Sequence, residues 1–436
     1  MLWCREGRLP DTRWSWVVCI SATLSNLLHF GFTQSFGVFL PVLSDHFKAG
    51  REKTAWAGSL ALSLTLFVGP IAVKLSQRFG HRKVAIAAGL GCAISLASSS
   101  FANDIVILYF TYGMVFGLSS GSILNTGYTI TTRYFKKKKA LATGITASGI
   151  SVGVMIISPI SEKLVEVFGW RNTFRVMAGM MLLICIFSST YDPIKVDSGL
   201  VVVVQQQKRY SCILDCTVFA NASYTIGLVA LTLTFFGFFV PIVHLVRFAK
   251  DLNISSKDAS FLFIYIGSTS TVSRIVIGQI IDKKWLTALQ VAQLCSLAMG
   301  VAIILFALAK EYSHFVVFSV AYGIISGGFI TGQNVFLQSI LQPEKSAIGL
   351  GMGYMVFSVA IAGGPPFVGF MADELGSYII SFYIIGGMMV ISAAFPFILL
   401  CSRCKKDGVG HEKVEICLHE NEDECKKENS VYISSL

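Results

Sequence analysis

The sequence predicts an all-α, polytopic membrane protein with twelve transmembrane helices in two six-helix pseudo-repeats. Three observations support this prediction: an apolar composition, a series of long apolar runs, and landmarks that recur at one spacing. Of 436 residues, 54% are hydrophobic and 14% are Asp, Glu, Lys or Arg, whereas about a quarter of residues are charged in soluble domains. This composition excludes a disordered or fibrous chain and disfavours a soluble protein.

Twelve apolar runs follow one another along the chain. A helix needs about 20 apolar residues to cross a bilayer, where it satisfies its own backbone N–H and C=O groups. The runs cover residues 16–43, 55–76, 84–102, 105–128, 140–161, 173–191, 216–246, 259–281, 285–309, 314–341, 347–371 and 377–401. So many consecutive runs leave little chain for a soluble domain.

The positions of the basic residues predict the orientation of these helices. If both termini are cytosolic, the inner segments contain about twice as many Lys and Arg residues as the outer segments, as the positive-inside rule requires. The first run follows Arg5, Arg8 and Arg13 and is too long for a cleaved signal peptide. The net charge of +10 is then a feature of topology and of contact with anionic lipids. Nucleic acid is not needed to explain it.

Landmarks in the two halves recur at nearly the same offset. Two Gly-Pro-Gly sets have internal spacings of 15 and 10 and are offset by 207, while Gln77 and Asp282 lie in corresponding loops and are offset by 205. Such repeats are typical of transporters that move around a midplane site. The sets are Gly144, Pro159 and Gly169, and Gly351, Pro366 and Gly376.

These boundaries predict the organisation of the chain. We expect a cytosolic amino terminus over 1–15, a six-helix half over 16–191, a cytosolic linker over 192–215, a second half over 216–401 and a tail over 402–436. The tail is rich in charge and has few apolar residues, so we expect it to be disordered.

Three motifs resemble one known family. Two tryptophans precede the first helix, a Tyr-Phe pair and a lysine run lead into the fifth helix, and a Gly-Pro-Pro sequence lies on the eleventh. On these motifs the chain resembles the major facilitator superfamily and, within it, the monocarboxylate-transporter family. The resemblance implies the major facilitator fold and secondary transport of a small carboxylated solute across the plasma membrane. The motif residues are Trp14, Trp16, Tyr134, Phe135, Gly144, Gly364, Pro365 and Pro366.

Arg274 is the candidate substrate-binding residue. It is the only basic residue well inside an apolar run, eight residues before Asp282, and an ionisable residue at membrane depth is a functional-site hypothesis by default. A guanidinium group binds a carboxylate through two parallel N–H···O bonds. The resemblance implies the same role, because the family has a carboxylate-binding arginine on helix eight. A pair with a backbone carbonyl or with another helix is the structural alternative.

Two positions depart from the best-known family members. Ser270 stands where they have an aspartate, and Gln34 stands where they have a lysine that gates the substrate. Neither residue titrates near neutral pH, so we expect facilitated diffusion rather than proton coupling through that pair. His29 is close to Gln34 in sequence and could titrate, although a hydrogen-bonded packing role is the alternative.

Short loops offer a candidate cytosolic latch. Asp282 with Lys283, and Arg78 with Arg82, match the superfamily's loop pattern, in which charge pairs hold the cytosolic ends of the halves together. Gln77 replaces the carboxylate of the first loop, so only the second loop keeps the pattern. Solvated loops that merely set the topology are the alternative.

Other functions and partners remain open. Aromatic residues on helix seven, with Gln333 and Asn334 on helix ten, suit aromatic amino acids or other zwitterionic solutes, or else pack in the core. A non-transporting membrane sensor or partner-binding protein of the same fold is an alternative of another class. The resemblance implies a single-pass immunoglobulin-type ancillary protein as a candidate partner. Ser434–Leu436 also fit the carboxyl-terminal motif that PDZ domains bind.

The sequence does not predict an enzyme, a cofactor or a metal site. It has no phosphate-binding loop, no His-Glu-x-x-His and no Gly-x-Ser-x-Gly. Cys401 and Cys404 form a Cys-x2-Cys without a second pair at zinc spacing. Asn253 begins a glycosylation sequon in a predicted outer loop.

Overall fold

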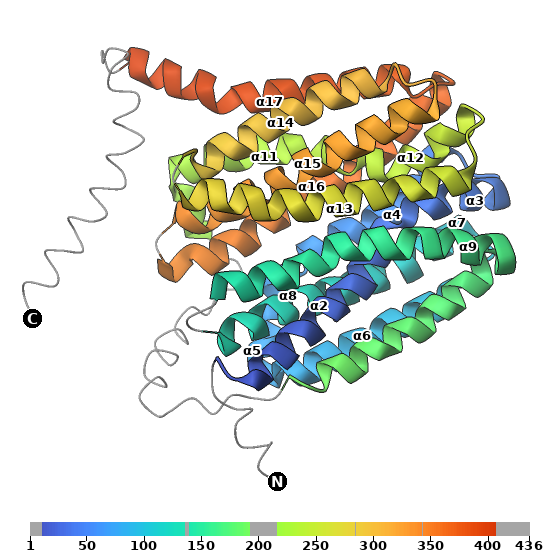
Figure 1. The fold of residues 1–436 in the computed structure, drawn as a ribbon, viewed down its shortest axis with the longest axis horizontal. Coiled ribbons are helices and arrows are strands. Elements are labelled where there is room, and N and C mark those ends of the chain that lie inside the picture. Colours follow the sequence, from blue (N-terminus) through green and yellow to red (C-terminus); the bar gives the residue numbers. More distant parts are fainter. Residues whose placement is uncertain (1–10, 136–138, 192–215, 284, 342, 407–436) are drawn as a thin grey trace, which may run out of the picture.

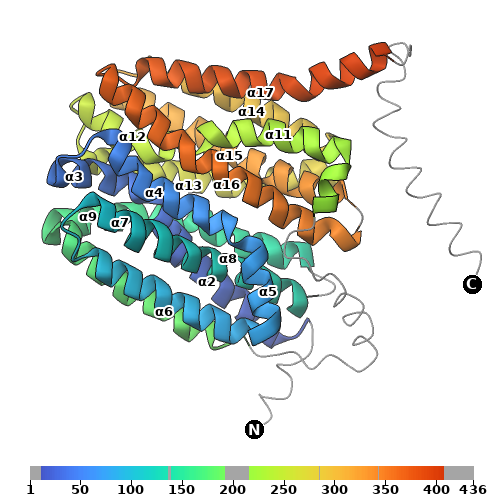
Figure 2. The ribbon, with the colours of Figure 1, turned by 180° about the vertical axis from the view of Figure 1, so that it is seen from behind.

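The computed structural model describes residues 11–135, 139–191, 216–283, 285–341 and 343–406. Every element in these ranges is helical. The helices form two groups that lie side by side, one coloured blue to green and the other yellow-green to red (Figures 1 and 2). These groups are the two predicted halves, so the predicted all-α fold is confirmed.

The first half contains nine elements among the described residues. They are α2 (Arg13–Gln34), α3 (Phe36–Phe47), α4 (Arg51–Phe67), α5 (Gly69–Phe79), α6 (His81–Ser99), α7 (Ile105–Leu108), the π-helix η1 (Tyr109–Phe116), α8 (Gly117–Tyr134) and α9 (Lys139–Ser188).

The second half contains eight elements in the described part of the chain. They are η3 (Cys216–Ala220), α11 (Ala222–Phe238), α12 (Val240–Asp251), α13 (Ser256–Asp282), α14 (Ala288–Phe306), α15 (Tyr312–Ser339), α16 (Pro343–Glu374) and α17 (Ile379–Lys406).

In three places, two helices join end to end and form one membrane span. Helices α2 and α3 meet at Ser35, α11 and α12 meet at Phe239, and α4 and α5 are bent by 49° at Val68. Pro70 and Pro241 follow two of these breaks, where the missing N–H of proline interrupts the helical hydrogen bonds.

The described helices account for the twelve predicted spans. Eight are long and apolar enough to cross a membrane, and the bent pair of α4 and α5 is a ninth. Helix α9 counts as two spans, because the chain reverses at Gly169 with a φ of 74°. Helix α6 and the apolar part of α17 (Ile379–Phe395) complete the twelve.

The ends of the bundle differ in which parts of the chain they hold. We call the end where α2 begins and α17 ends the terminal end. The opposite end, which contains the turns at 48–50, 252–255 and 375–378, is the distal end (Figure 1). In the predicted topology the terminal end is cytosolic.

The interface between the halves follows their pseudo-symmetry. Helix α4 packs against α16, and α9 packs against α13. These are spans two and eleven, and spans five and eight, which exchange when the two halves are interchanged. Such an interface lets one half rock against the other around a central site.

Glycines spaced four apart mark a close contact between α2 and α9. A Cβ at Gly149 or Gly153 would lie 2.3 Å from the carbonyl oxygen of Thr23 or 2.4 Å from that of Leu27. Glycine is needed at both positions, because any larger side chain would separate α2 from α9.

Some predicted boundaries differ from the observed ones. Helix α2 starts at Arg13 rather than 16, η3 occupies part of the predicted seventh run before α11, and α17 continues past 401 to Lys406. A hydropathy window does not register the capping and turn residues that set helix ends. The linker at 192–215 and the tail beyond Lys406 lie outside the described residues.

Candidate functional site

Arg274 lies on α13, eight residues before the helix ends at Asp282. At 1.5 Å per residue that is roughly 12 Å from the terminal end of the helix, so Arg274 lies a little past the middle of α13, on the side of the terminal end. Its Nη1 donates to the carbonyl oxygen of Ala147 on α9 at 3.5 Å, the outer limit for a hydrogen bond. Its Nε is buried without a partner.

No carboxylate within the described ranges forms an ion pair with Arg274. Arg274 is half-buried as a whole, but its Nε is enclosed, and the long contact to one carbonyl satisfies little of the hydrogen-bonding capacity of the guanidinium. The site is therefore suited to an added anion.

Two tyrosines are electrostatic neighbours of the Arg274 guanidinium. Tyr128 comes from α8 in the first half, and Tyr354 comes from α16 in the second. Together with Ala147 they place Arg274 at the junction of both halves. The Tyr128 hydroxyl has no hydrogen-bond partner among the residues that the structure describes, so it can donate to a bound solute.

A polar network extends from Tyr354 to α15. The Tyr354 hydroxyl donates to Asn334 Oδ1 at 2.5 Å, and Gln333 Nε2 donates to the same oxygen at 2.7 Å. Gln333 is fully buried, and its Oε1 has no partner in the described structure. The sequence indicated Gln333 and Asn334 only as general polar residues near the cavity.

Gln34 and Ser270 occupy different surroundings. Gln34 is the last residue of α2 and is half-buried, and no described contact joins it to Arg274. Ser270 lies one turn before Arg274 with 5% of its surface exposed. Its backbone faces α15, where a Cβ on Gly327 would lie 2.5 Å from the Ser270 carbonyl oxygen. Their substrate-binding role stays a prediction.

His29 is hydrogen-bonded at both ring nitrogens within the first half. Its Nε2 lies 3.1 Å from Asn26 Oδ1, and its Nδ1 lies 2.7 Å from Ser120 Oγ. The Asn26 amide nitrogen donates to the carbonyl oxygen of Thr146 at 3.0 Å, which leaves Asn26 Oδ1 free to accept from Nε2–H. A neutral imidazole satisfies this arrangement, which ties α2 to α8 and α9.

Two cations of the candidate latch lie over aromatic rings close to them in sequence. The Arg78 guanidinium lies 5.4 Å from the ring centre of Phe79, and Lys283 Nζ lies 5.2 Å from that of Trp285. Arg82 is exposed near the start of α6. The side chain of Asp282 lies outside the described part of the chain, so the latch stays a prediction.

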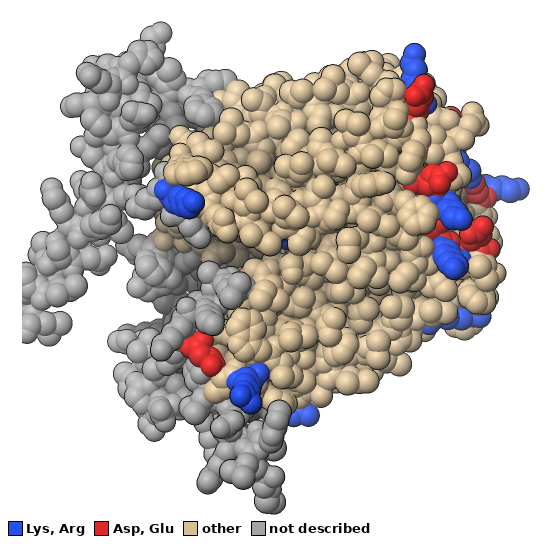
Figure 3. Space-filling view, in the orientation of Figure 1, with Lys and Arg blue, Asp and Glu red and all other residues tan. Residues whose placement is uncertain are grey.

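Charge pairs between the halves lie at the distal end in the described part of the chain. Arg51 Nη2 lies 2.8 Å from Asp251 Oδ2 and its Nε 3.8 Å from Asp373 Oδ1, while Arg247 and Lys250 lie 3.1 and 2.5 Å from Asp45. We call this set the distal cluster: Asp45, Arg51, Arg247, Lys250, Asp251 and Asp373. Its charges gather at one end of the molecule (Figure 3).

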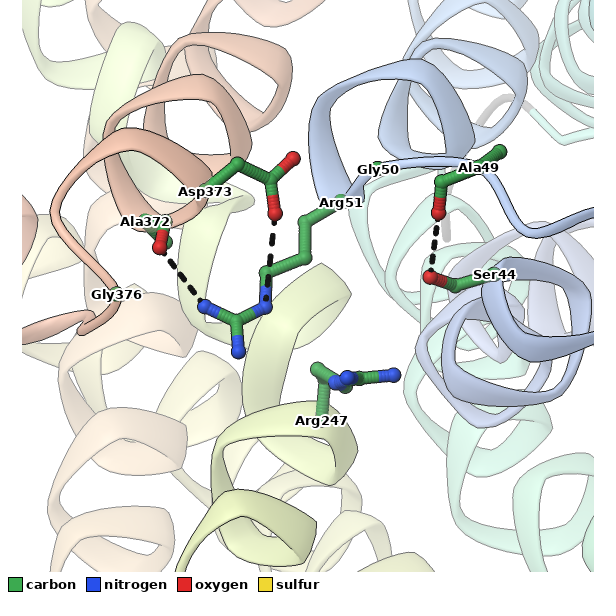
Figure 4. Close-up of a pocket in the computed structure, with 8 residues that line it drawn as sticks. All are labelled: Ser44, Ala49, Gly50, Arg51, Arg247, Ala372, Asp373 and Gly376. Atoms are coloured by element: carbon green, nitrogen blue, oxygen red, sulfur yellow. Dashed lines mark hydrogen bonds and ion pairs between the residues drawn. The ribbon is translucent and has the colours of Figure 1, made fainter.

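The distal cluster is reinforced by hydrogen bonds and a ring. Arg51 Nη1 donates to the carbonyl oxygen of Ala372 at 2.9 Å, and its guanidinium lies 4.9 Å from the ring centre of Tyr378. A shallow pocket of about 240 Å³ remains between Arg51, Arg247 and Asp373 (Figure 4). Its cations are already paired, so this pocket is not the carboxylate site. The distal end is held closed.

The first two family motifs contact each other at the terminal end. The Trp16 and Phe135 rings are edge to face at 4.9 Å, and the backbone N–H of Asp11 donates to the Tyr134 carbonyl oxygen at 2.9 Å. Trp14 is partly buried beside this contact. These motif residues anchor the start of α2 on the loop between α8 and α9.

The remaining motif residues lie on α9 and α16. Gly144 is exposed, with space around its Cα. A Cβ at Gly364 would lie 1.8 Å from the Phe236 carbonyl oxygen, so only glycine fits there. His244 Nε2 donates to the Pro365 carbonyl oxygen at 2.9 Å, and Pro366 is buried beside it.

These features define a transporter built from two six-helix halves, with the half-buried Arg274 at their junction. The chain belongs to the major facilitator superfamily, whose family model matches residues 22–312 and 225–414. It is therefore a multi-pass membrane protein and a secondary transporter, and the superfamily is not one of enzymes.

Within the superfamily, the chain belongs to the monocarboxylate-transporter family. It is 30% identical to monocarboxylate transporter 3 of Rattus norvegicus over 91% of this chain and 82% of the relative. It is 28% identical to monocarboxylate transporter 4 of Gallus gallus over 93% and 87%, and 29% identical to monocarboxylate transporter 10 of Mus musculus over 86% and 77%.

Solved structures show the same fold. A D-xylose-proton symporter matches with a TM-score of 0.70 and 16% identity, over 87% of this chain and 96% of that chain. A bacterial homologue of the human lysosomal transporter Spinster matches with a TM-score of 0.67 and 15% identity, over 89% and 97%. At these identities the likeness concerns the fold alone.

Sequence reasoning missed Tyr128, Tyr354 and the distal cluster. Buried tyrosines also fill the core, as at Tyr112 and Tyr322, so no sequence signal separates the two that face Arg274. The distal charges lie in short outer segments, where charged residues are common and predict no partner.

Proposed function

We propose that the protein moves a monocarboxylate or a related small carboxylated solute across the plasma membrane by alternating access. The observation that carries this proposal is the half-buried Arg274 on α13, whose guanidinium has no carboxylate partner among the described residues and contacts α9 of the other half. A substrate carboxylate would accept two parallel N–H···O bonds and supply the missing charge. The names of the 26–30% identical relatives support the substrate class.

The proposed cycle rocks the halves around Arg274. With the distal cluster paired, the site communicates with the terminal end, which we propose is cytosolic together with both termini. Opening of the distal end would separate the four ion pairs of the distal cluster that join the two halves. Because Tyr128 and Tyr354 come from different halves, a carboxylate bound at Arg274 contacts both and favours their approach.

We further propose that transport is not coupled to protons through the family's usual residues. Ser270 and Gln34 do not titrate near neutral pH. His29 is engaged by two hydrogen bonds within the first half, away from any described contact with Arg274. The direction of net transport then follows the concentration gradient and the membrane potential acting on the anion.

Uptake into liposomes that contain the purified protein tests this function. A labelled panel of lactate, ketoacids, aromatic amino acids, carnitine and creatine would be measured at two pH values, with Arg274→Ala beside the wild type. We expect uptake of a carboxylate that Arg274→Ala abolishes. Unchanged uptake by this variant would refute the proposed mechanism, and binding without flux would indicate a sensor instead.

A further inference from the structure

The contact between α4 and α16 at the distal end brings two helix ends together. Helix α4 of the first half begins at Arg51, and α16 of the second half ends at Glu374. A Cβ at Gly369 would lie 2.7 Å from the Glu52 backbone nitrogen, so only glycine lets the last turns of α16 come this close. The amide end of α4 thus lies beside the carbonyl end of α16, which the two helix dipoles favour.

Helix α4 receives a cap from the other half of the protein. Its own N-cap residue, Gly50, has no side chain that could accept a hydrogen bond from the first turn, where the N–H groups have no partner within the helix. Asp373 Oδ2 accepts from the Glu52 backbone N–H at 3.1 Å. The same oxygen lies 2.6 Å from the position that a Cβ on Gly50 would take. The Asp373 carboxylate therefore takes the place of the missing cap side chain.

Arg51 does the reverse for the end of α16. The last four carbonyl groups of a helix have no donor within it, and Ala372 is the third residue from the end of α16. Its carbonyl oxygen accepts from Arg51 Nη1 at 2.9 Å (Figure 4). Each half of the protein therefore caps a helix end of the other half.

We infer that Asp373 is a positioning residue that closes the distal end by capping α4, with Arg51 as its counterpart on α16. The ion pair between them is long, with Arg51 Nε 3.8 Å from Asp373 Oδ1, and the Asp373 side chain is 32% accessible, so charge pairing contributes little. The bond to the Glu52 N–H does not need the charge, since Asn caps a helix about as well as Asp.

The caps make opening of the distal end more costly than the ion pairs alone would. When the halves separate there, the Glu52 N–H and the Ala372 carbonyl oxygen lose their partners together and must bond to water, or the helix ends must unwind. This cost arises at the contact of α4 with α16 and not at Arg274. The inference therefore goes beyond the proposed function and holds whichever solute is carried.

Substitutions at Asp373 separate capping from charge. Purified Ser44→Cys protein is the parent, because Ser44 lines the distal pocket. The rate at which a maleimide labels the thiol at position 44, read from its peptide by mass spectrometry, reports opening. Asp373→Ala removes the cap and should raise this rate about fivefold or more. Asp373→Asn keeps an oxygen acceptor without the charge and should stay within about twofold of the parent.

A neighbouring carboxylate provides the matched control. Glu374 follows Asp373 at the end of α16 and is exposed, and it forms no ion pair in the described structure. Glu374→Ala removes a negative charge from the same helix end but no cap. It should label at the parent rate.

A second variant separates the cap on α4 from the link between the halves. Gly50 has a φ of −59° and a ψ of 163°, which other residues also adopt. Gly50→Ser in the Asp373→Ala background places a hydroxyl in the space that the carboxylate has left, and caps α4 from within the first half. It should recover any Tm that Asp373→Ala loses, while labelling stays fast.

Three outcomes would overturn the inference. Equal labelling of Asp373→Asn and Asp373→Ala would show that charge pairing closes the distal end. Labelling of Asp373→Ala at the parent rate would show that the cap does not close it. Slow labelling restored by Gly50→Ser would show that the cap acts within α4 alone. With any of these results, loss of carboxylate uptake in Arg274→Ala would leave the proposed function standing.

Discussion

The arginines of the distal end and of the membrane interior have opposite surroundings. Arg51 has two carboxylate partners, Asp251 and Asp373, and Arg247 also has two, Asp45 and Asp251. Arg274 has none among the described residues and reaches only a backbone carbonyl at 3.5 Å. The described residues thus supply counter-charges to the arginines at the distal end of the bundle and none to the arginine inside it.

This difference distinguishes a structural arginine from a binding one. The distal pairs are partly exposed, with the Arg51 and Asp45 side chains 15% and 54% accessible, so each pair stabilises the closed end by about 1 kcal/mol or less. Arg274 contributes nothing comparable until an anion arrives. We therefore propose that the distal arginines stabilise one conformation, whereas Arg274 binds the substrate.

The largest expected effect is on uptake after substitution of Arg274. Arg274→Gln should lower carboxylate uptake by at least about 30-fold, because losing one partner of a buried charge pair costs about 2–5 kcal/mol. Arg274→Lys keeps the charge but loses the planar fork, and should retain only part of the activity. Initial rates normalised to surface protein measure both, with Arg247→Lys as the control that should transport nearly normally.

An intermediate effect is expected when Arg274 is given a partner of its own. Ser270→Asp places a carboxylate one turn earlier on α13, where it can pair with the guanidinium and compete with the substrate. We expect KM to rise about tenfold and to fall again as acidification neutralises the new carboxyl group. Ser270→Asn is the matched neutral control, and a KM raised equally by both changes would point to packing rather than charge.

Loss of the distal pairs should have a smaller effect on conformation. Arg51→Gln should open the distal end about fivefold more often, since about 1 kcal/mol favours the closed state. Labelling of Ser44→Cys by a membrane-impermeant maleimide reports this opening, because Ser44 lines the distal pocket. Glu52→Gln is the control, as Glu52 forms no ion pair in the described structure. Equal labelling rates in Arg51→Gln and the parent protein would contradict a gating role.

The smallest effect is expected from pH on the unmodified protein. Ser270, Gln34 and the doubly bonded His29 offer no group that must gain a proton during transport, so uptake should vary by less than about twofold between pH 6 and 7.5. Initial rates at clamped membrane potential measure this. Strong acceleration at acid pH would show that a proton site exists elsewhere.

Much of the fold could be predicted from the sequence. Length and apolarity of the runs alone predict twelve spans, because a bilayer sets the helix length. Glycines spaced four apart indicate close helix packing, but they do not show that α2 meets α9. The reversal at Gly169 is also visible in the sequence as the end of the Gly-Pro-Gly repeat. Helix ends and the joining of α4 to α5 depend on local hydrogen bonds that hydropathy does not report.

The candidate site could be predicted only at its charged centre. Arg274 stands out because a charge in an apolar run is costly. Tyr128, Gln333 and Tyr354 do not, since polar side chains are also used for helix packing in membranes. The proximity of Tyr128 and Tyr354 to Arg274 depends on how the two halves approach each other, which no single run reveals.

The most direct test of the central claim is ligand-dependent stability of the purified protein. The best carboxylate from the uptake panel should raise the Tm of the wild type, as binding to the folded state alone must, and its uncharged amide analogue should not. In Arg274→Gln the carboxylate should no longer raise the Tm, whereas in Arg51→Gln it should do so as before. An equal Tm increase in Arg274→Gln and the wild type would contradict the account.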